Sequence, residues 1–378
     1  MSRRALGVAV LALAGGVTGC AGGDDGDVSS MAETTSTASG TQVTSSPTAP
    51  VAPTAAQRAG ARVVFPLVGT TPPGALLARL RRGEAAGVIF FARNIASPAQ
   101  VRALTRRLRA AVPTGAPPPL LMVDQEGGPV KRLPGAPTRG AREIAATGRP
   151  SVARAEGAAT ARTLRAAGMN VDLAPVVDVV RPGSALAGEG RGFGSTPEDA
   201  GRFGAAFIEG LQDGGVAAAA KHFPGFGAAG LNTDDGPTTI DLSAATLRRT
   251  DRAPFRAATI VGVRMVMLSS AIYPALARVP AVLSRRIVTG ELREGLGYEG
   301  VTISDDLQTP AFAAHGGATG AGLAAARAGV DLLLFAGGYT AAARATRALA
   351  AAIRRRAIPT SELDASAARI AALRETLR

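Results

Sequence analysis

Eight short runs of apolar, often β-branched residues recur between residues 62 and 335, and they constrain the fold more than any other feature. They lie at residues 62–68, 87–92, 120–124, 170–177, 216–222, 265–270, 301–304 and 330–335. Each run is almost continuously apolar, which is typical of a parallel strand buried on both faces. Ala- and Arg-rich helical patterns separate them, for example at 98–111, 152–167, 197–213, 285–295 and 317–328. Eight strand-then-helix units in roughly 300 residues predict a single (β/α)8 TIM barrel, an α/β fold.

Local signals support the helices between these runs. Pro98 and Pro197 stand where proline is tolerated, in a first helical turn. Ser97 and Thr196, the residues before them, are predicted N-caps. A helix over 361–377 follows the last unit, and we expect no second folded domain. A doubly wound open sheet is the alternative, but it normally has fewer strands, and no glycine-rich dinucleotide loop follows the first run.

The first twenty residues have the pattern of an export signal. Arg3 and Arg4 form a short positive region, and residues 5–17 are apolar but too few to span a bilayer comfortably. The stretch ends in Val-Thr-Gly-Cys at Cys20, the one cysteine of the chain, and looks like a bacterial lipobox. We predict a lipoprotein signal peptide over residues 1–19, cleavage before Cys20 and lipidation of its thiol. The alternative is an ordinary signal peptide followed by an incidental cysteine.

Residues 20–57 are predicted to be a disordered linker. They are mostly Gly, Asp, Ser, Thr, Pro and Ala, and such a segment cannot bury enough surface to offset the ordering of its backbone. The linker would hold the barrel, residues 58–378, away from the membrane. We therefore expect an extracytoplasmic protein that is anchored to the cell membrane through Cys20.

Charge and composition exclude some partners. The formal net charge is +13, and it is almost entirely due to arginine because only Lys131 and Lys221 are lysines. The arginines form no basic run with interleaved aromatic residues, so we do not expect nucleic-acid binding. Attraction to anionic wall polymers or lipid headgroups accounts better for the charge. Trp is absent, so a stacking platform for a long glycan is missing and short substrates or chain ends are favoured.

Polar clusters follow five of the eight runs. They are Arg93-Asn94, Asp124-Gln125-Glu126-Gly127-Gly128, Asp178 with the later Arg191-Gly192-Phe193-Gly194, Lys221-His222-Phe223-Pro224-Gly225, and Ser304-Asp305-Asp306-Leu307. In a parallel barrel the strands end at one face, where active sites lie. One charged strand end could be a salt bridge of the rim, but five on one face favour a functional pocket.

The chemistry of these clusters suits a polyhydroxylated ligand. Carboxylates at Asp124 and Asp305 can accept hydrogen bonds from sugar hydroxyls, and cations can donate to the same hydroxyls. The cations are Arg132, Arg191 and Lys221. The only histidines are His222 and His315 and there is no cysteine cluster, so we predict no metal site and no cofactor. No Gly-x-Ser-x-Gly motif is present, which argues against a serine hydrolase.

Four of these segments together resemble a known family. They are Gly87-Val88-Ile89-Phe90-Phe91-Ala92-Arg93-Asn94, Val123-Asp124-Gln125-Glu126-Gly127-Gly128, Lys221-His222-Phe223-Pro224-Gly225 and Ser304-Asp305-Asp306-Leu307. In this order they resemble the single-barrel β-N-acetylhexosaminidases of glycoside hydrolase family 3, which act on peptidoglycan and its fragments. The likeness runs from about residue 60 to the C-terminus.

The resemblance implies a role for each matching residue. Asp305 matches the family's nucleophile, which would form a covalent glycosyl-enzyme and retain the anomeric configuration. Neighbouring Lys and Arg side chains are expected to keep Asp305 ionised. The residues that match those holding the nonreducing-end sugar are Asp124, Arg132, Arg191, Lys221 and His222.

The sequence departs from the family at the acid/base. The family carries Lys-His-Phe-Pro-Gly-His-Gly followed by Asp-Ser-His, and the Asp and His of the latter form a dyad whose His protonates the leaving oxygen. Here the first motif reads Lys221-His222-Phe223-Pro224-Gly225-Phe226-Gly227, so Phe226 stands where the family has the His between the two glycines. Asn232 and Asp234 stand where the family has the Asp and the His of the dyad. Pro129 replaces the Arg that often follows the Gly-Gly pair.

Three hypotheses follow for the missing acid/base. Asp234 or Asp235 supplies the proton, with a pKa raised by burial or by Asp305. Alternatively His315 substitutes, or the protein has lost hydrolysis and binds wall glycans. A β-glucosidase or phosphorylase variant also remains open, because the sugar's 2-substituent and the acceptor cannot be read from the sequence. We expect a monomer.

Overall fold

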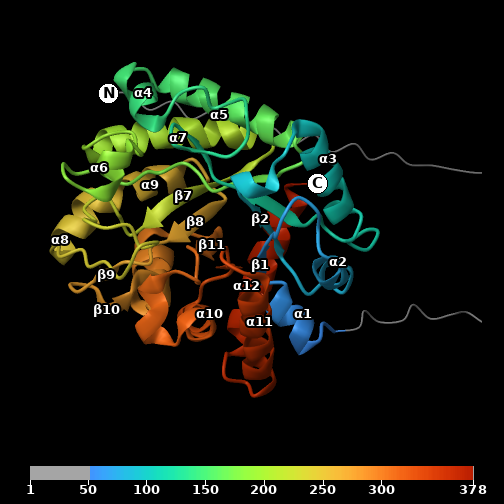
Figure 1. Cartoon of the computed structure of the whole chain (residues 1–378). Helices are drawn as coiled ribbons and strands as arrows, with labels where there is room; N and C mark the ends of the chain where they lie inside the picture. Colours follow the sequence, from blue (N-terminus) through green and yellow to red (C-terminus); the bar gives the residue numbers. More distant parts are fainter. Residues whose placement is uncertain (1–51, 378) are drawn as a thin grey trace, which may run out of the picture. The chain divides into compact units, whose positions relative to one another are not determined.

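The computed structural model describes residues 52–377, which form an α/β fold around one parallel sheet (Figure 1). The strands of the sheet are β1 (Val63–Pro66), β2 (Gly87–Phe90), β3 (Leu120–Val123), β6 (Val171–Asp172), β7 (Ala217–Phe223), β8 (Met265–Leu268), β11 (Val301–Ser304) and β12 (Leu333–Leu334). Their order is β11-β8-β7-β6-β3-β2-β1-β12. A parallel bridge between Ile303 and Leu332 connects the two ends of this order. The result is a nearly closed eight-stranded barrel, and the eight predicted strands are confirmed.

A helix follows each strand, as the predicted strand-then-helix pattern requires. The longer helices are α2 (Gly74–Arg81), α3 (Pro98–Arg109), α5 (Pro150–Ala166), α7 (Pro197–Asp213), α9 (Ala253–Ile260), α10 (Gly317–Ala328), α11 (Tyr339–Arg354) and α12 (Thr360–Glu375). The predicted caps are confirmed, because the Ser97 hydroxyl accepts from the Gln100 amide and the Thr196 hydroxyl from the Asp199 amide. No helix within residues 52–377 is long and apolar enough to cross a membrane.

Two predicted segments differ from the structure. The helix predicted over 285–295 is a π-helix, η4 (Arg286–Glu294). The predicted linker end at residue 57 falls inside α1 (Ala55–Gly60), which begins at a capping box between Thr54 and Gln57 and packs against α11. The capping box therefore begins a helix at residues that the composition had placed in the linker. The predicted signal peptide, Cys20 and the rest of the linker lie outside the described residues.

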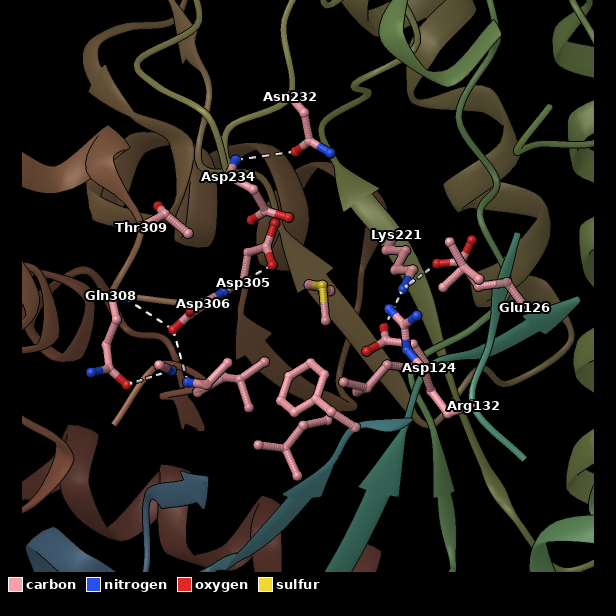
Figure 2. A pocket seen from close by; sticks show the side chains of 18 of the residues that line it. Asp124, Glu126, Arg132, Lys221, Asn232, Asp234, Asp305, Asp306, Gln308 and Thr309 are labelled. Atoms are coloured by element: carbon pink, nitrogen blue, oxygen red, sulfur yellow. Dashed lines mark hydrogen bonds and ion pairs between the residues drawn. The ribbon is translucent and has the colours of Figure 1, made fainter. Parts of the chain in front are cut away.

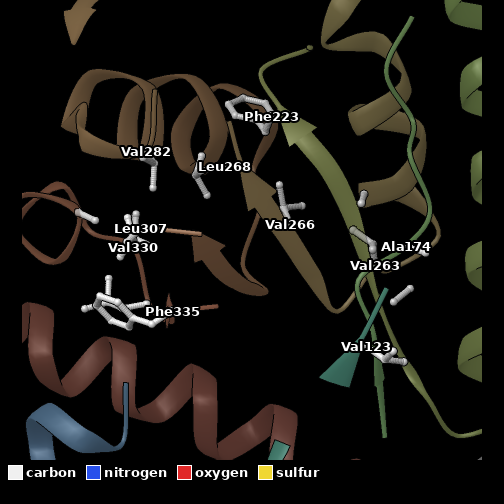
Figure 3. Close-up of a cluster of buried hydrophobic side chains, with 14 of the residues drawn as sticks. Val123, Ala174, Phe223, Val263, Val266, Leu268, Val282, Leu307, Val330 and Phe335 are labelled. Atoms are coloured by element: carbon white, nitrogen blue, oxygen red, sulfur yellow. The ribbon is translucent and has the colours of Figure 1, made fainter. Parts of the chain in front are cut away.

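Two apolar layers flank the strands. Inside the barrel, alternate strand residues such as Val64, Ile89 and Met122 pack together, and α12 closes one end with Ile370 and Leu373. Outside the barrel, the intervening strand residues pack under the helices. Figure 3 shows part of this outer layer, including Val123, Phe223, Val266, Leu268 and Phe335.

Asp331 fixes the closed end of the barrel. It is fully buried, and its carboxylate accepts from Arg293 of η4 at 2.6 Å and from Arg369 of α12 at 2.8 Å. The same carboxylate accepts from the Thr302 amide and hydroxyl of β11. With this end occupied by α12, the strand ends opposite are the open face of the barrel.

Candidate active site

A cavity of about 710 Å³ lies at the carboxyl ends of the barrel strands. Its floor is apolar, with Ile89, Phe91, Leu173, Met267 and Leu334. Its walls are polar, and Figure 2 shows carboxylates and cations that project into it from both sides. The labelled residues are Asp124, Glu126, Arg132, Lys221, Asn232, Asp234, Asp305, Asp306, Gln308 and Thr309. Such a cavity suits a ligand with an apolar face and a hydroxylated rim.

One wall is a chain of alternating charges. The Lys221 ammonium on β7 donates to Asp124 and to Glu126, at 2.7 Å in each case. The Arg191 guanidinium binds both oxygens of Glu126 at 2.8 Å and donates to Glu189 at 2.9 Å. Burial disfavours ionised Glu126, but Lys221 and Arg191 outweigh that cost and lower its pKa to about 2. The two carboxylates likewise raise the pKa of Lys221 against its burial, so this network stays ionised.

Short structural elements position these charges. Asp124 and Glu126 flank Gln125 at the start of a hairpin formed by β4 (Gln125–Gly127) and β5 (Val130–Lys131). Gly127 in the hairpin has φ +89, and a Cβ there would lie 2.4 Å from the Arg139 carbonyl oxygen, which explains the glycine of the motif. Arg191 follows α6 (Ala185–Glu189), which ends at the left-handed Gly190.

Arg132 is the cation of this wall without a carboxylate partner among the described residues. Its backbone amide donates to the Gln125 side chain, and its Nε is buried without a hydrogen-bond acceptor. Arg132 lines the cavity. Its guanidinium is therefore available to a ligand.

His222 is held by Asp178, for which no role was predicted. Asp178 is fully buried, and its carboxylate lies 2.9 Å from His222 Nδ1 and accepts from the Phe226 amide at 2.6 Å. The ring of Phe226 packs 5.5 Å from the His222 ring and is 5% exposed. The position at which the family has a histidine is thus part of the packing around His222.

The opposite wall carries Asp305 and Asp306 directly after β11. The Asp306 amide donates to Asp305 at 2.8 Å. Asp306 accepts from the amides of Gln308 and Ala336, so it ties the loop after β11 to the loop after β12. Burial raises the pKa of Asp306 to about 6. Among residues 52–377 no ion pair joins Asp305 to Lys or Arg, and Lys221 and Arg191 bind Glu126. That neighbouring cations keep Asp305 ionised stays a prediction.

Asp234 lines the cavity beside Asp305. It lies on the loop after β7, where its amide donates to the Asn232 side chain at 3.1 Å. In Figure 2 the carboxyl groups of Asp234 and Asp305 point toward one another. Asp234 is open to the solvent of the cavity, yet desolvation by the surrounding protein and the negative charge of Asp305 raise its pKa to about 6.

The structure brings all seven predicted pocket residues to one cavity. They are Asp124, Arg132, Arg191, Lys221, His222, Asp234 and Asp305. Asp235 and His315, the other two predicted proton donors, are not among the residues that line it. No role was predicted for Glu126, although its spacing of two from Asp124 in an extended segment places both side chains on one face. In the described part of the chain no group of His, Cys, Asp and Glu is arranged to hold a metal ion.

The barrel and its polar cavity are those expected of a glycoside hydrolase, and comparison with known proteins gives the class and the family. Residues 69–373 match the family described as "Glycosyl hydrolase family 3 N terminal domain". The chain belongs to glycosyl hydrolase family 3.

Named relatives and solved structures agree with this assignment. The chain is 38% identical to an "uncharacterized secreted glycosyl hydrolase" of Arthroderma benhamiae, over 85% of this chain and 94% of that protein. It is 38% identical to a β-hexosaminidase of Stenotrophomonas maltophilia, over 68% of this chain and 77% of the relative.

Two solved structures share the barrel. A family 3 β-N-acetylglucosaminidase from Paenibacillus sp. FPU-7 superimposes with a TM-score of 0.82 at 33% identity, over 85% of this chain. The match covers 62% of that longer protein, which is less than two thirds of its length. A β-N-acetylhexosaminidase from Beutenbergia cavernae matches with a TM-score of 0.77 at 28% identity, over 85% of this chain and 98% of that one.

Proposed function

We propose that this protein is a retaining exo-β-N-acetylhexosaminidase, built on a (β/α)8 barrel, that acts on peptidoglycan-derived glycans. The observation that carries the proposal is the pair formed by Asp305 and Asp234, whose carboxyl groups point toward one another in the cavity (Figure 2). Retaining glycosidases need one carboxylate that is ionised and one carboxyl that holds a proton. A pKa of about 6 suits Asp234 to the second role.

In the first step a carboxylate oxygen of Asp305 attacks the anomeric carbon. The new C–O bond forms as the glycosidic C–O bond breaks, and the leaving oxygen takes the proton of Asp234. In the second step Asp234, now ionised, removes a proton from water, and the water oxygen attacks the same carbon. The bond to Asp305 breaks, and two inversions give net retention.

The pKa of Asp234 depends on the charge of Asp305, which changes between these two steps. Asp305 is negative in the free enzyme, and this charge favours the protonated form of Asp234. Once Asp305 is esterified its charge is gone, so Asp234 loses its proton more readily when it must serve as a base. One carboxyl group can therefore act first as an acid and then as a base.

The charged wall suits recognition of the terminal sugar. Asp124 has one oxygen bound to Lys221, which leaves the other for a sugar hydroxyl. Lys221, Arg191 and Glu126 hold one another in place before a ligand arrives, so little ordering is needed on binding. The guanidinium of Arg132 is available to donate to the same sugar.

The relatives support the substrate class and the location. The Stenotrophomonas relative is called a β-hexosaminidase, and the Arthroderma relative is called secreted. Together with the predicted signal peptide, these names support an extracytoplasmic enzyme, and the predicted lipid on Cys20 would anchor it to the membrane. A cavity whose floor is closed by apolar side chains of the barrel favours action on chain ends.

The test is hydrolysis of a panel of nitrophenyl β-glycosides by the wild type, Asp305→Ala and Asp234→Ala. We expect the wild type to release nitrophenol from the N-acetylglucosaminide and Asp305→Ala to be inactive. Asp234→Ala should keep much of its activity on nitrophenyl substrates, because this leaving group needs little protonation, and should lose far more on an unactivated disaccharide. Added azide should restore turnover of the Asp234 variant by giving the β-glycosyl azide.

Equal losses on both substrates would reject Asp234 as the acid. Hydrolysis of the glucoside but not the N-acetylglucosaminide would correct the sugar class, and turnover that requires phosphate would identify a phosphorylase. If the folded wild type hydrolyses none of these glycosides but binds wall glycans, the proposed hydrolase activity is wrong and the glycan-binding alternative is favoured.

A further inference from the structure

Three neighbouring helices of the outer ring carry charge of one sign only: α2, α3 and α11 contain nine arginines and no acidic residue. These helices follow β1, β2 and β12, and these three strands are adjacent in the sheet. Figure 1 shows the helices along one side of the barrel, with α1 against α11. Arginines that are far apart in the sequence are thus gathered on one surface, here called the basic face.

Most of these side chains are exposed and have no carboxylate partner among the described residues. Arg102, Arg106 and Arg107 project from α3, and Arg344, Arg347 and Arg354 project from α11. Two further arginines of the face are engaged, because Arg79 contacts Glu84 and Arg109 donates to the Gly168 carbonyl. The positive charge of the basic face is therefore mostly not neutralised by the protein.

The other side of the barrel does not share this property. Helices α5 and α7 contain four arginines and five acidic residues. Arg154 of α5 bonds with Glu209 and Asp213 of α7, and Arg202 bonds with Asp199. Arg162 and Arg165 of α5 also lack a carboxylate partner, so the two sides differ in net charge: α5 and α7 carry one more acidic residue than arginines, whereas α2, α3 and α11 carry only arginines. The segregation points to a ligand on one side.

We propose that the basic face binds a polymer of closely spaced phosphate groups that is not a nucleic acid. The guanidinium groups are suited to phosphate oxygens, to which they can donate two parallel hydrogen bonds. A row of unpaired cations releases counterions from a polyanion on binding.

Other polyanions fit this surface less well. α2 and α3 contain no aromatic residue, and the one aromatic of α11, Tyr339, is partly buried and bonded to Arg79, so the bases of a single-stranded nucleic acid have no platform to stack on. The large apolar side chains that the described residues expose are Val68, Leu231 and Ile260, and none of them lies on these helices. A membrane-inserting surface would need such side chains.

The basic face adjoins the rim of the cavity. The segments that lead into its helices line the cavity, with Val68 and Gly69 before α2, Arg93 before α3 and Gly337 before α11. A phosphate polymer on this face would keep the open end of the barrel beside an anionic matrix, where the glycans of the proposed function occur. Binding to the polymer does not depend on that function, since no residue of the basic-face helices α2, α3 and α11 lines the cavity.

The test compares the full chain with two variants of equal charge loss. The first carries Arg106→Gln, Arg107→Gln, Arg344→Gln and Arg347→Gln in the basic face. The matched control carries Arg154→Gln, Arg162→Gln, Arg165→Gln and Arg202→Gln in α5 and α7. Thermal unfolding monitors folding, and hydrolysis of an aryl glycoside, where present, should be the same in all three.

Binding to labelled long-chain inorganic polyphosphate is then measured against salt. With five to seven contacts, wild-type affinity should fall on the order of 10²- to 10³-fold between 50 and 200 mM salt. The basic-face variant should lose at least about tenfold at low salt, and the control variant much less. Equal losses in both variants, or no binding by the wild type, would overturn the proposal. Tighter binding to single-stranded or duplex DNA, or to anionic vesicles of phosphatidylglycerol, would overturn the proposal and reassign the face to those partners.

Discussion

Replacing Glu126 by Gln is the sharpest test of the charged wall, because Gln keeps the shape of the side chain and removes its charge. Glu126 is buried, and Lys221 and Arg191 lower its pKa from 4.5 to about 2. Each pKa unit corresponds to about 1.4 kcal/mol, so the ionised side chain stabilises the fold by about 3 kcal/mol at neutral pH. We expect the free energy of unfolding of Glu126→Gln to be lower by about that amount.

The sign of the pH dependence follows from the direction of the shift. A carboxyl whose folded pKa is depressed contributes stability above its unfolded pKa and loses it as pH falls toward the folded value. For Glu126 this window runs from about 4.5 down to about 2. The difference between wild type and Glu126→Gln should therefore shrink from about 3 kcal/mol at pH 7 to about 1.5 kcal/mol at pH 3.

Urea unfolding at the two pH values measures this difference. Glu189→Gln is the matched control, because Glu189 also contacts Arg191 but its side chain is 37% exposed, and an exposed pair contributes about 0–1 kcal/mol. Two results would refute the interpretation of this wall as an ionised, buried network. One is a decrease in the free energy of unfolding of Glu126→Gln that is the same at both pH values. The other is a decrease no larger than that of Glu189→Gln.

Further predictions concern Asp234, Asp306 and Asp331. For an unactivated β-glycoside, kcat/KM should fall about tenfold per pH unit above pH 6, because the proton on Asp234 is present below its raised pKa and lost above it. Asp234→Asn should not show this fall of kcat/KM above pH 6. Asp306→Asn should still show it, although the pKa of Asp306 is also about 6. The reverse result would assign the fall to Asp306. Asp331→Ala should lower the free energy of urea unfolding by about 3–5 kcal/mol, since Arg293 and Arg369 lose their buried partner. The same variant should leave KM for an aryl glycoside unchanged, and a raised KM would mean that the closed end of the barrel communicates with the cavity.

Local sequence information was sufficient for the elements of the barrel. Strands with two buried faces must be apolar along their whole length, so the eight runs are visible without knowledge of their partners. Helix starts are equally local, because a cap such as Ser97 bonds to an amide three residues away. The motifs at the strand ends were sufficient to predict seven side chains that line one cavity.

What the sequence alone could not decide depends on contacts between distant residues. The charged wall joins Lys221 to Asp124 across 97 positions and Arg191 to Glu126 across 65, so the sequence does not show which carboxylate each cation meets. Asp234 and Asp235 are adjacent and chemically identical, and only the fold turns one toward Asp305 and leaves the other outside the cavity. The arginines that look dispersed along the chain form one basic face because the barrel closes β12 onto β1 and sets α11 beside α2 and α3. Residue chemistry and local pattern are properties of the sequence, whereas pKa values, ion-pair partners and charged surfaces arise only when the closed sheet brings distant segments together.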